Sequence, residues 1–167
     1  MPSSFPYYQY LKYYLSAKNK HSIHSPFVYR LLTKAITPKN KTLLKTSRHY
    51  IELKKRLIEY LNPKSILEIG SSLFSEQKNA YYTDFNEVKE KKIDFIYLND
   101  TSEKKIVTAL KYMHNDSVLV LNNLYKTKEN WQKLKDHSQV RVSINLFQLG
   151  IIFMREEQEK QHFTIRF

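Results

Sequence analysis

The chain has 167 residues, no cysteine, 41% hydrophobic residues and a formal net charge of +12. This length suits one domain with a sizeable core, and the lack of cysteine excludes disulfides and thiolate metal sites. No apolar run approaches the roughly 20 residues of a membrane span, and residues 1–15 lack the apolar core of a secretory signal. These properties predict a soluble cytoplasmic protein that has no membrane partner.

The positive charge is concentrated in the N-terminal third. Residues 1–64 contain thirteen Lys or Arg and two acids, whereas residues 65–167 contain fifteen Lys or Arg and fourteen acids. Such a basic segment can bind an acidic partner or nucleic acid. We favour the alternative of a solvated helical surface, because Lys outnumbers Arg 22 to 6 and Arg is the better ligand for phosphates and base edges.

Residues 1–63 are predicted to form a basic helical cap. Ser25 followed by Pro26 is a typical helix N-cap and first helical residue. Basic residues of the third helix, Lys54 among them, are expected on its exposed side. Apolar residues recur at helical spacing in three segments, 7–17, 26–36 and 47–61.

Residues 64–167 are predicted to form an α/β sheet within the same compact domain. Helices at 103–113 and 129–137 alternate with apolar strands, which indicates a parallel sheet with right-handed crossovers. The last three strands have very short links, so this end of the sheet is expected to be antiparallel. The strands are expected at 65–69, 81–85, 93–98, 117–121, 140–147, 150–154 and 162–167.

The first of these strands ends with Glu68-Ile69 and is followed by Gly70-Ser71-Ser72. Gly70 is one of only two glycines, and glycine lets a chain turn sharply and leaves space beside its backbone. A strand that ends in such a turn is where α/β sheets bind nucleotide-type ligands. A plain junction between a strand and a turn explains the same pattern equally well.

This layout resembles the Rossmann-like sheet of class I S-adenosylmethionine-dependent methyltransferases, which is mostly parallel and ends in an antiparallel C-terminal hairpin. The C-terminal hairpin and the segment 24–27 are similar to the branch that methylates small molecules on oxygen. The resemblance covers most of the chain and implies S-adenosylmethionine as cofactor and a small-molecule methyl acceptor. It rests on short motifs at 67–72, 94–99, 118–125, 144–147, 149–153 and 24–27.

The resemblance also implies a cofactor site at the ends of the strands. Residues at the turn after the first strand would line the methionine end of the cofactor, and those at the two later strand ends would face the adenosine or the substrate. The cofactor-binding residues implied in this way are Glu68, Gly70, Ser71, Ser72, Asp84, Asn99 and Asn122.

The sequence departs from the family pattern after Gly70. Further glycines are usual in this turn, and here Phe74 stands at a usual glycine position, where its ring could either fill part of the cofactor space or leave the pocket intact. The 23 residues from Gly70 to Ile93 are too few for the usual elements, so one strand unit is expected to be missing. Asp84 is the ribose-binding acid if 81–84 is the second strand. We favour the alternative, in which Asp84 follows the third strand and no ribose acid remains.

No residue is assigned to catalysis. Asn99, Asn122 and Asn123 stand where metal-dependent members of the family carry carboxylates, so no divalent metal is expected. Amides cannot take up a proton near neutral pH, but methyl transfer needs mainly alignment of its reactants.

These residues predict a methyltransferase-like pseudoenzyme, a degenerate protein with weak or no activity. One alternative is a non-catalytic interaction module that binds an acidic partner or nucleic acid through residues 1–64. Another is a homodimer that pairs through the sheet edge left open by the missing unit.

Overall fold

The computed structural model describes residues 6–19, 23–37, 47–76, 80–89 and 91–166. The helices are α1 (Tyr7–Ser16), α2 (Pro26–Leu31), the π-helix η2 (Leu32–Ile36), α3 (Ser47–Leu61), α4 (Phe85–Val88), α5 (Glu103–Lys111), the 3-10 helix η3 (Leu124–Lys126) and α6 (Lys128–Asp136). The strands are β1 (Ser65–Ile69), β2 (Ala80–Tyr82), β3 (Phe95–Leu98), β4 (Val118–Leu121), β5 (Val142–Asn145), β6 (Gly150–Phe153) and β7 (Gln161–Thr164).

The seven strands form one sheet in the order β2-β1-β3-β4-β6-β5-β7. Strands β2, β1, β3 and β4 are parallel, and β6 runs antiparallel to both β4 and β5. The predicted α/β sheet and its antiparallel C-terminal hairpin are therefore confirmed. The expectation that all three final strands are antiparallel is wrong for β7, which pairs parallel with β5. The link after β6 passes β5 and places β7 on its far side, so β7 has the direction of β5.

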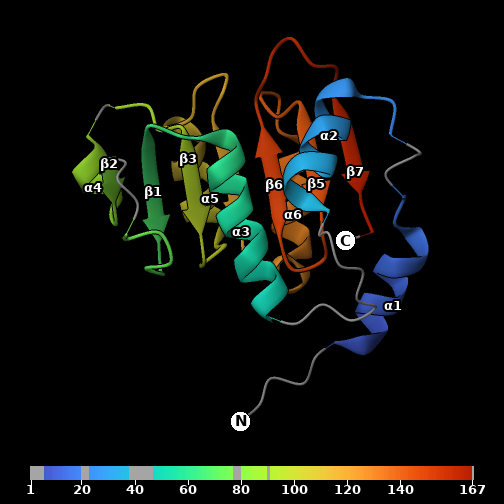
Figure 1. The fold of residues 1–167 in the computed structure, drawn as a ribbon. Coiled ribbons are helices and arrows are strands. Elements are labelled where there is room, and N and C mark those ends of the chain that lie inside the picture. The colour runs from blue at the N-terminus through green and yellow to red at the C-terminus, as the bar shows by residue number, and fades with distance from the viewer. Residues whose placement is uncertain (1–5, 20–22, 38–46, 77–79, 90, 167) are drawn as a thin grey trace.

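Helices cover both faces of this sheet (Figure 1). Helices α2, η2 and α3 lie on one face, and α4, α5 and α6 pack on the other. Successive strand residues alternate between the two cores, as Ile66 and Leu67 do on β1. Strands β3 and β4 are buried throughout, and β1 is buried except at the half-buried Ser65, which explains their nearly continuous apolar sequence.

The sheet is short at its β2 edge. In the described residues between β1 and β3, the chain forms a turn, the three-residue strand β2 and the four-residue helix α4. This arrangement confirms the prediction that one strand unit is missing. Strand β2 consequently stands at the end of the sheet, while β1 has a partner on each side.

Lys54 of α3 is buried, with only 6% of its surface exposed, so the expectation of an exposed side chain is wrong. It shares the stripe that faces the sheet with Tyr50, Leu53 and Leu57, all of which are buried. Its amine donates a hydrogen bond to the hydroxyl of Tyr97 at 2.6 Å. The helical pattern indicated an apolar stripe but not that it includes a lysine.

The burial of Lys54 predicts a pH dependence of stability. Burial lowers the pKa of Lys54 from its ordinary value of 10.5 to about 8, although the nearby Glu68 carboxylate partly opposes this change. Between these two values the unfolded chain binds more protons than the folded chain, so the free energy of unfolding should rise with pH by up to roughly 1.4 kcal/mol per pH unit. Urea denaturation at pH 8, 8.5, 9 and 9.5 measures this slope.

The variant Lys54→Met is the control, since it should have a flatter slope over the same range. The range stops below pH 10 because burial raises the pKa of Tyr81 to about 12. Unfolding would release that proton at higher pH, and stability would then fall. Equal slopes in the two proteins would contradict a lowered pKa of Lys54.

Helix α1 lies outside the layers of the sheet and its helices, near β7 and the C-terminus (Figure 1). It has no buried residue, and Tyr7 and Leu11 are 70% and 55% exposed. The helix is attached through aromatic rings, because Tyr10 and Tyr13 both pack on Phe147. Among the described residues, no helix has both the length and the apolar character needed to cross a bilayer.

The segment after α1 extends the sheet beyond β7. The Lys18 amide donates to the Thr164 carbonyl at 2.8 Å, and the Lys18 carbonyl accepts from the Arg166 amide at 3.0 Å. Tyr13 also donates its hydroxyl proton to the Ile165 carbonyl. The two ends of the described chain are therefore joined, and this segment covers the edge of β7.

Candidate functional site

Three of the predicted site residues meet at the carboxyl edge of the sheet. The side-chain amide of Asn122, after β4, donates to the Asn99 side-chain oxygen at 2.7 Å. Asn99, after β3, donates in turn to the Gly70 carbonyl at 2.8 Å. A line of hydrogen bonds thus connects the ends of β1, β3 and β4, as expected for neighbouring parallel strands.

Gly70 adopts a positive φ of +78°, a conformation that strongly favours glycine. A Cβ atom at this position would lie 3.4 Å from the Cβ of Asn99. The surface of Gly70 is exposed, so the turn leaves backbone accessible at the sheet edge. Ser72 is also exposed, and Ser71 is half-buried.

Glu68 lies beneath this turn and is fully buried. Its carboxylate accepts hydrogen bonds from the amides of Leu73 and Phe74 at 2.7 and 2.9 Å. The hydroxyl of Tyr81 donates to it at 2.9 Å, and the Ser71 hydroxyl donates to it as well. The acid therefore organises its own turn by accepting backbone amides that would otherwise be available to a ligand.

The ring of Phe74, whose position the sequence left open, does not fill the space at the carboxyl edge. Phe74 is 1% exposed and belongs to the core beneath α3. It makes edge-to-face contacts with Phe95 and Tyr97, whose ring centroids lie 5.6 and 5.8 Å away. The ring thus covers the face of β3 rather than the exposed surface of Gly70.

Asp84 follows β2, the next strand after β1 and its direct neighbour. The alternative that we preferred, in which this acid follows an outer third strand, is therefore wrong. Asp84 is exposed, and its carboxylate accepts a hydrogen bond from the Asn86 amide at 2.7 Å, which caps α4. The structure shows no hydrogen bond from Asp84 to Gly70, Asn99 or Asn122 within the described residues.

Asp100 is an acid beside this edge, and its carboxylate already has two interaction partners, Lys105 and Ser102. Its carboxylate lies 2.7 Å from the Lys105 amine and accepts a hydrogen bond from the Ser102 amide. The Lys105 hydrogen bond and then the Ser102 hydrogen bond lower the pKa of this carboxyl below its usual range. In the part of the chain that the structure describes, no group of three His, Cys, Asp or Glu could bind a metal ion.

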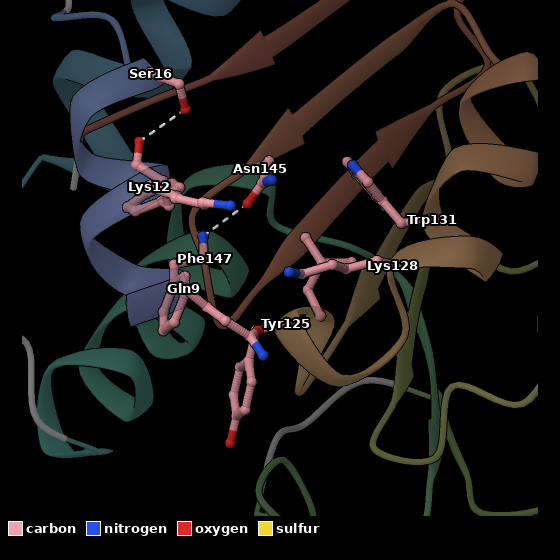
Figure 2. Close-up of a pocket in the computed structure, with 10 residues that line it drawn as sticks. Gln9, Lys12, Ser16, Tyr125, Lys128, Trp131, Asn145 and Phe147 are labelled. Atoms are coloured by element: carbon pink, nitrogen blue, oxygen red, sulfur yellow. Dashed lines mark hydrogen bonds between the residues drawn. The ribbon is translucent and has the colours of Figure 1, made fainter. Parts of the chain in front are cut away.

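A cavity of about 200 Å³ lies at the ends of β4 and β5, and α1 forms its outer wall (Figure 2). Lys12 reaches it from α1, Lys128 and Trp131 from α6, and Asn145 from the end of β5. A wider hollow of about 490 Å³ continues over the start of α6 and shares Tyr125 and Lys128 with it. Residues 70–72 line neither of these two cavities.

Gly150 determines the position of one wall of the cavity. A Cβ atom here would lie 2.6 Å from Cζ3 of Trp131 and 3.1 Å from Cδ1 of Leu124. The missing side chain therefore lets the indole ring pack directly on β6. Opposite it, Tyr125 stacks on Phe147, with ring centroids 5.2 Å apart and an interplanar angle of 11°.

The charged groups around the cavity are all positive. Lys12 and Lys128 extend toward it (Figure 2), and no acid lines it. Neither lysine forms an ion pair with an acid within the described residues, although the Lys12 amine lies 4.5 Å above the ring of Tyr8. The side-chain oxygen of Gln9 is buried there and accepts no hydrogen bond from a described residue.

No sequence motif indicates this cavity. Its charged residues, Lys12 and Lys128, lie far apart in the sequence, and neither belongs to a motif. The available signals were the single tryptophan, Trp131, and Gly150, the second of only two glycines. They lie 19 positions apart and meet only in the folded chain.

No protein-family model and no curated protein sequence matches this chain. Solved structures do share its fold. The SAH-bound methyltransferase PaMTH1 from Podospora anserina is 10% identical, with a TM-score of 0.51 over 92% of this chain and 97% of its own. Cofactor-bound Rv0187 from MTB is also 10% identical, with a TM-score of 0.50 over 94% of this chain and 100% of its own. The chain thus has a class I methyltransferase-like, Rossmann-like fold.

Proposed function

We propose that the chain is a degenerate methyltransferase-like protein that binds S-adenosylmethionine weakly and has little or no catalytic activity. One observation carries this proposal: Gly70 keeps an open turn at the sheet edge, while Glu68 accepts the amides of Leu73 and Phe74. These inward-facing amides cannot also bind the carboxylate of a ligand. The proposed cofactor site thus keeps its open turn at Gly70, but the backbone amides of Leu73 and Phe74 are not available as hydrogen-bond donors to a ligand.

The residues at this edge fit a nucleoside-type cofactor in part. Gly70, Ser71 and Ser72 would hold the methionine end, and Asp84 would accept hydrogen bonds from the ribose hydroxyls. The side-chain oxygen of Asn122 is buried and has no donor among the described residues, so it suits an N–H group of the ligand. When bound, the cofactor would supply the methyl group as a sulfonium.

Catalysis by this edge would depend on positioning. Asn99 and Asn122 cannot accept a proton near neutral pH, and Asp100 is paired with Lys105. Alignment of an acceptor with the sulfonium would therefore be the main contribution of the protein. A panel of phenol and carboxylate acceptors is expected to yield no S-adenosylhomocysteine above background, and clear turnover would contradict the proposed degeneracy.

Calorimetric titration tests the cofactor site. Wild-type protein is expected to bind S-adenosylmethionine and S-adenosylhomocysteine, and Gly70→Val should abolish binding because a branched side chain would be strained at positive φ and would cover the turn. Asn62→Val is the matched control, since Asn62 also has a positive φ, of 46°, but precedes the opposite end of β1. Absence of heat with the wild type, or equal loss in both variants, would contradict this site.

The second candidate is an interaction module that binds an acidic partner or nucleic acid. It is favoured by the surface of α1, which contains Lys12 and no acid and exposes Tyr7, Tyr8 and Leu11. Exposed aromatic rings beside a cation can stack on unpaired bases. Oligonucleotide binding should then weaken steeply between 50 and 200 mM salt, as fluorescence anisotropy would show. Affinity that does not change with salt would exclude this candidate.

A further inference from the structure

We propose that the cavity between α1 and α6 binds a small aromatic acid. Its ring would lie against Trp131, and its acid group would lie between Lys12 and Lys128. Neither this binding nor its test requires a methyl donor. The proposal therefore does not depend on the cofactor site at Gly70.

The cavity beside Trp131 has room for about one ring. A protein cavity of about 150 Å³ accepts one benzene molecule, and this cavity measures about 200 Å³. That volume accommodates a ring with one acidic substituent, while the adjoining hollow over the start of α6 stays open to solvent-sized groups. The walls suit an aromatic body, because Trp131, Leu124 and Phe147 all line the cavity.

The polar groups favour an anion. Two ammonium groups that face one cavity without a carboxylate repel each other, and a bound anion would offset that repulsion. Asn145 adds a third donor: its side-chain oxygen accepts the Phe147 amide at 2.8 Å, which leaves its NH2 group available. The buried oxygen of Gln9, which has no donor among the described residues, could accept a hydrogen bond from a ring hydroxyl.

The walls are preformed rather than assembled by the ligand. The contact of Trp131 with Gly150 fixes the indole, and the Tyr125–Phe147 stack supports the opposite side. Because the wall is preformed, few side chains lose conformational entropy when a ligand binds. Moderate affinity for a single-ring acid is therefore expected despite the small contact area.

The test uses benzoate as the probe and the full chain without methyl donor. Trp131 is the only tryptophan, so its fluorescence reports the cavity directly, and calorimetry gives an independent measurement. Benzoate should bind saturably. Benzamide, which has the ring without the charge, and acetate, which has the charge without the ring, should each bind at least about tenfold more weakly.

Lysine substitutions test which amines bind the carboxylate of benzoate. Lys12→Met and Lys128→Met should each weaken benzoate binding about tenfold. The matched control is Lys133→Met on the same helix, where the amine pairs with Glu103 at 2.9 Å, and it should leave binding unchanged. Melting curves establish that each variant is folded. The proposal is overturned by no response in either measurement at 10 mM benzoate, by equal binding of benzamide, or by equal losses in Lys133→Met and Lys128→Met.

Discussion

Replacement of Glu68 by alanine is expected to lower the free energy of unfolding by about 3–5 kcal/mol. The carboxylate accepts the Leu73 and Phe74 amides and the Tyr81 hydroxyl, and alanine would leave these donors without an acceptor. The change also removes the negative charge that favours the charged form of the buried Lys54. Urea denaturation monitored by circular dichroism measures the loss.

Glu87→Ala is the matched control for Glu68→Ala. Glu87 also accepts hydrogen bonds at a strand end, from the backbone amide and the hydroxyl of Thr83 at 3.0 Å each, but these bonds are exposed. Its removal should cost less than about 1 kcal/mol, because water can replace the lost acceptor. If both variants lose the same stability, the buried role assigned to Glu68 is wrong.

Phe74→Ala is expected to cost about 3–5 kcal/mol, because it would leave a cavity in the core beneath α3. The ring is nearly fully buried and packs edge-to-face on Phe95 and Tyr97. Phe74→Leu should retain more than half of this contribution, since it keeps most of the apolar volume. Denaturation midpoints with unchanged m-values would report the loss.

A phenylalanine at the edge of the molecule provides the comparison for Phe74→Ala. Phe85 stacks on Tyr112 and is only half-buried, so Phe85→Ala should lose less than half as much stability. The prediction also separates two roles of Phe74. If Phe74→Ala left stability unchanged and strengthened S-adenosylmethionine binding, the ring would be an obstruction at the cofactor site rather than part of the core.

The sequence predicted those parts of the fold that depend on local pattern. Apolar strands such as 117–121 were identified because they are buried on both faces. The parallel direction of β7 was missed, because it depends on which side of β5 the last strand occupies. Lys54 was misplaced because helical periodicity locates a stripe but does not show that a lysine can lie within it and reach Tyr97.

The part of the candidate cofactor site that consists of residues at strand ends could be predicted from the sequence. Gly70, Asn99 and Asn122 follow adjacent parallel strands, so their meeting could be expected from the alternation of strands and helices. The partners of Glu68 could not be expected, because they depend on the path of the turn after Gly70. The cavity beneath α1 depends on tertiary packing between segments far apart in the chain.

The junction of the two chain ends has a consequence for synthesis on the ribosome. Arg166 contacts the Tyr14 carbonyl across 152 positions of sequence. At 5–20 residues per second, roughly 8 to 30 seconds pass between the translation of these two residues. Helix α1 therefore leaves the ribosome well before its docking surface exists, and its attachment comes after the sheet is complete.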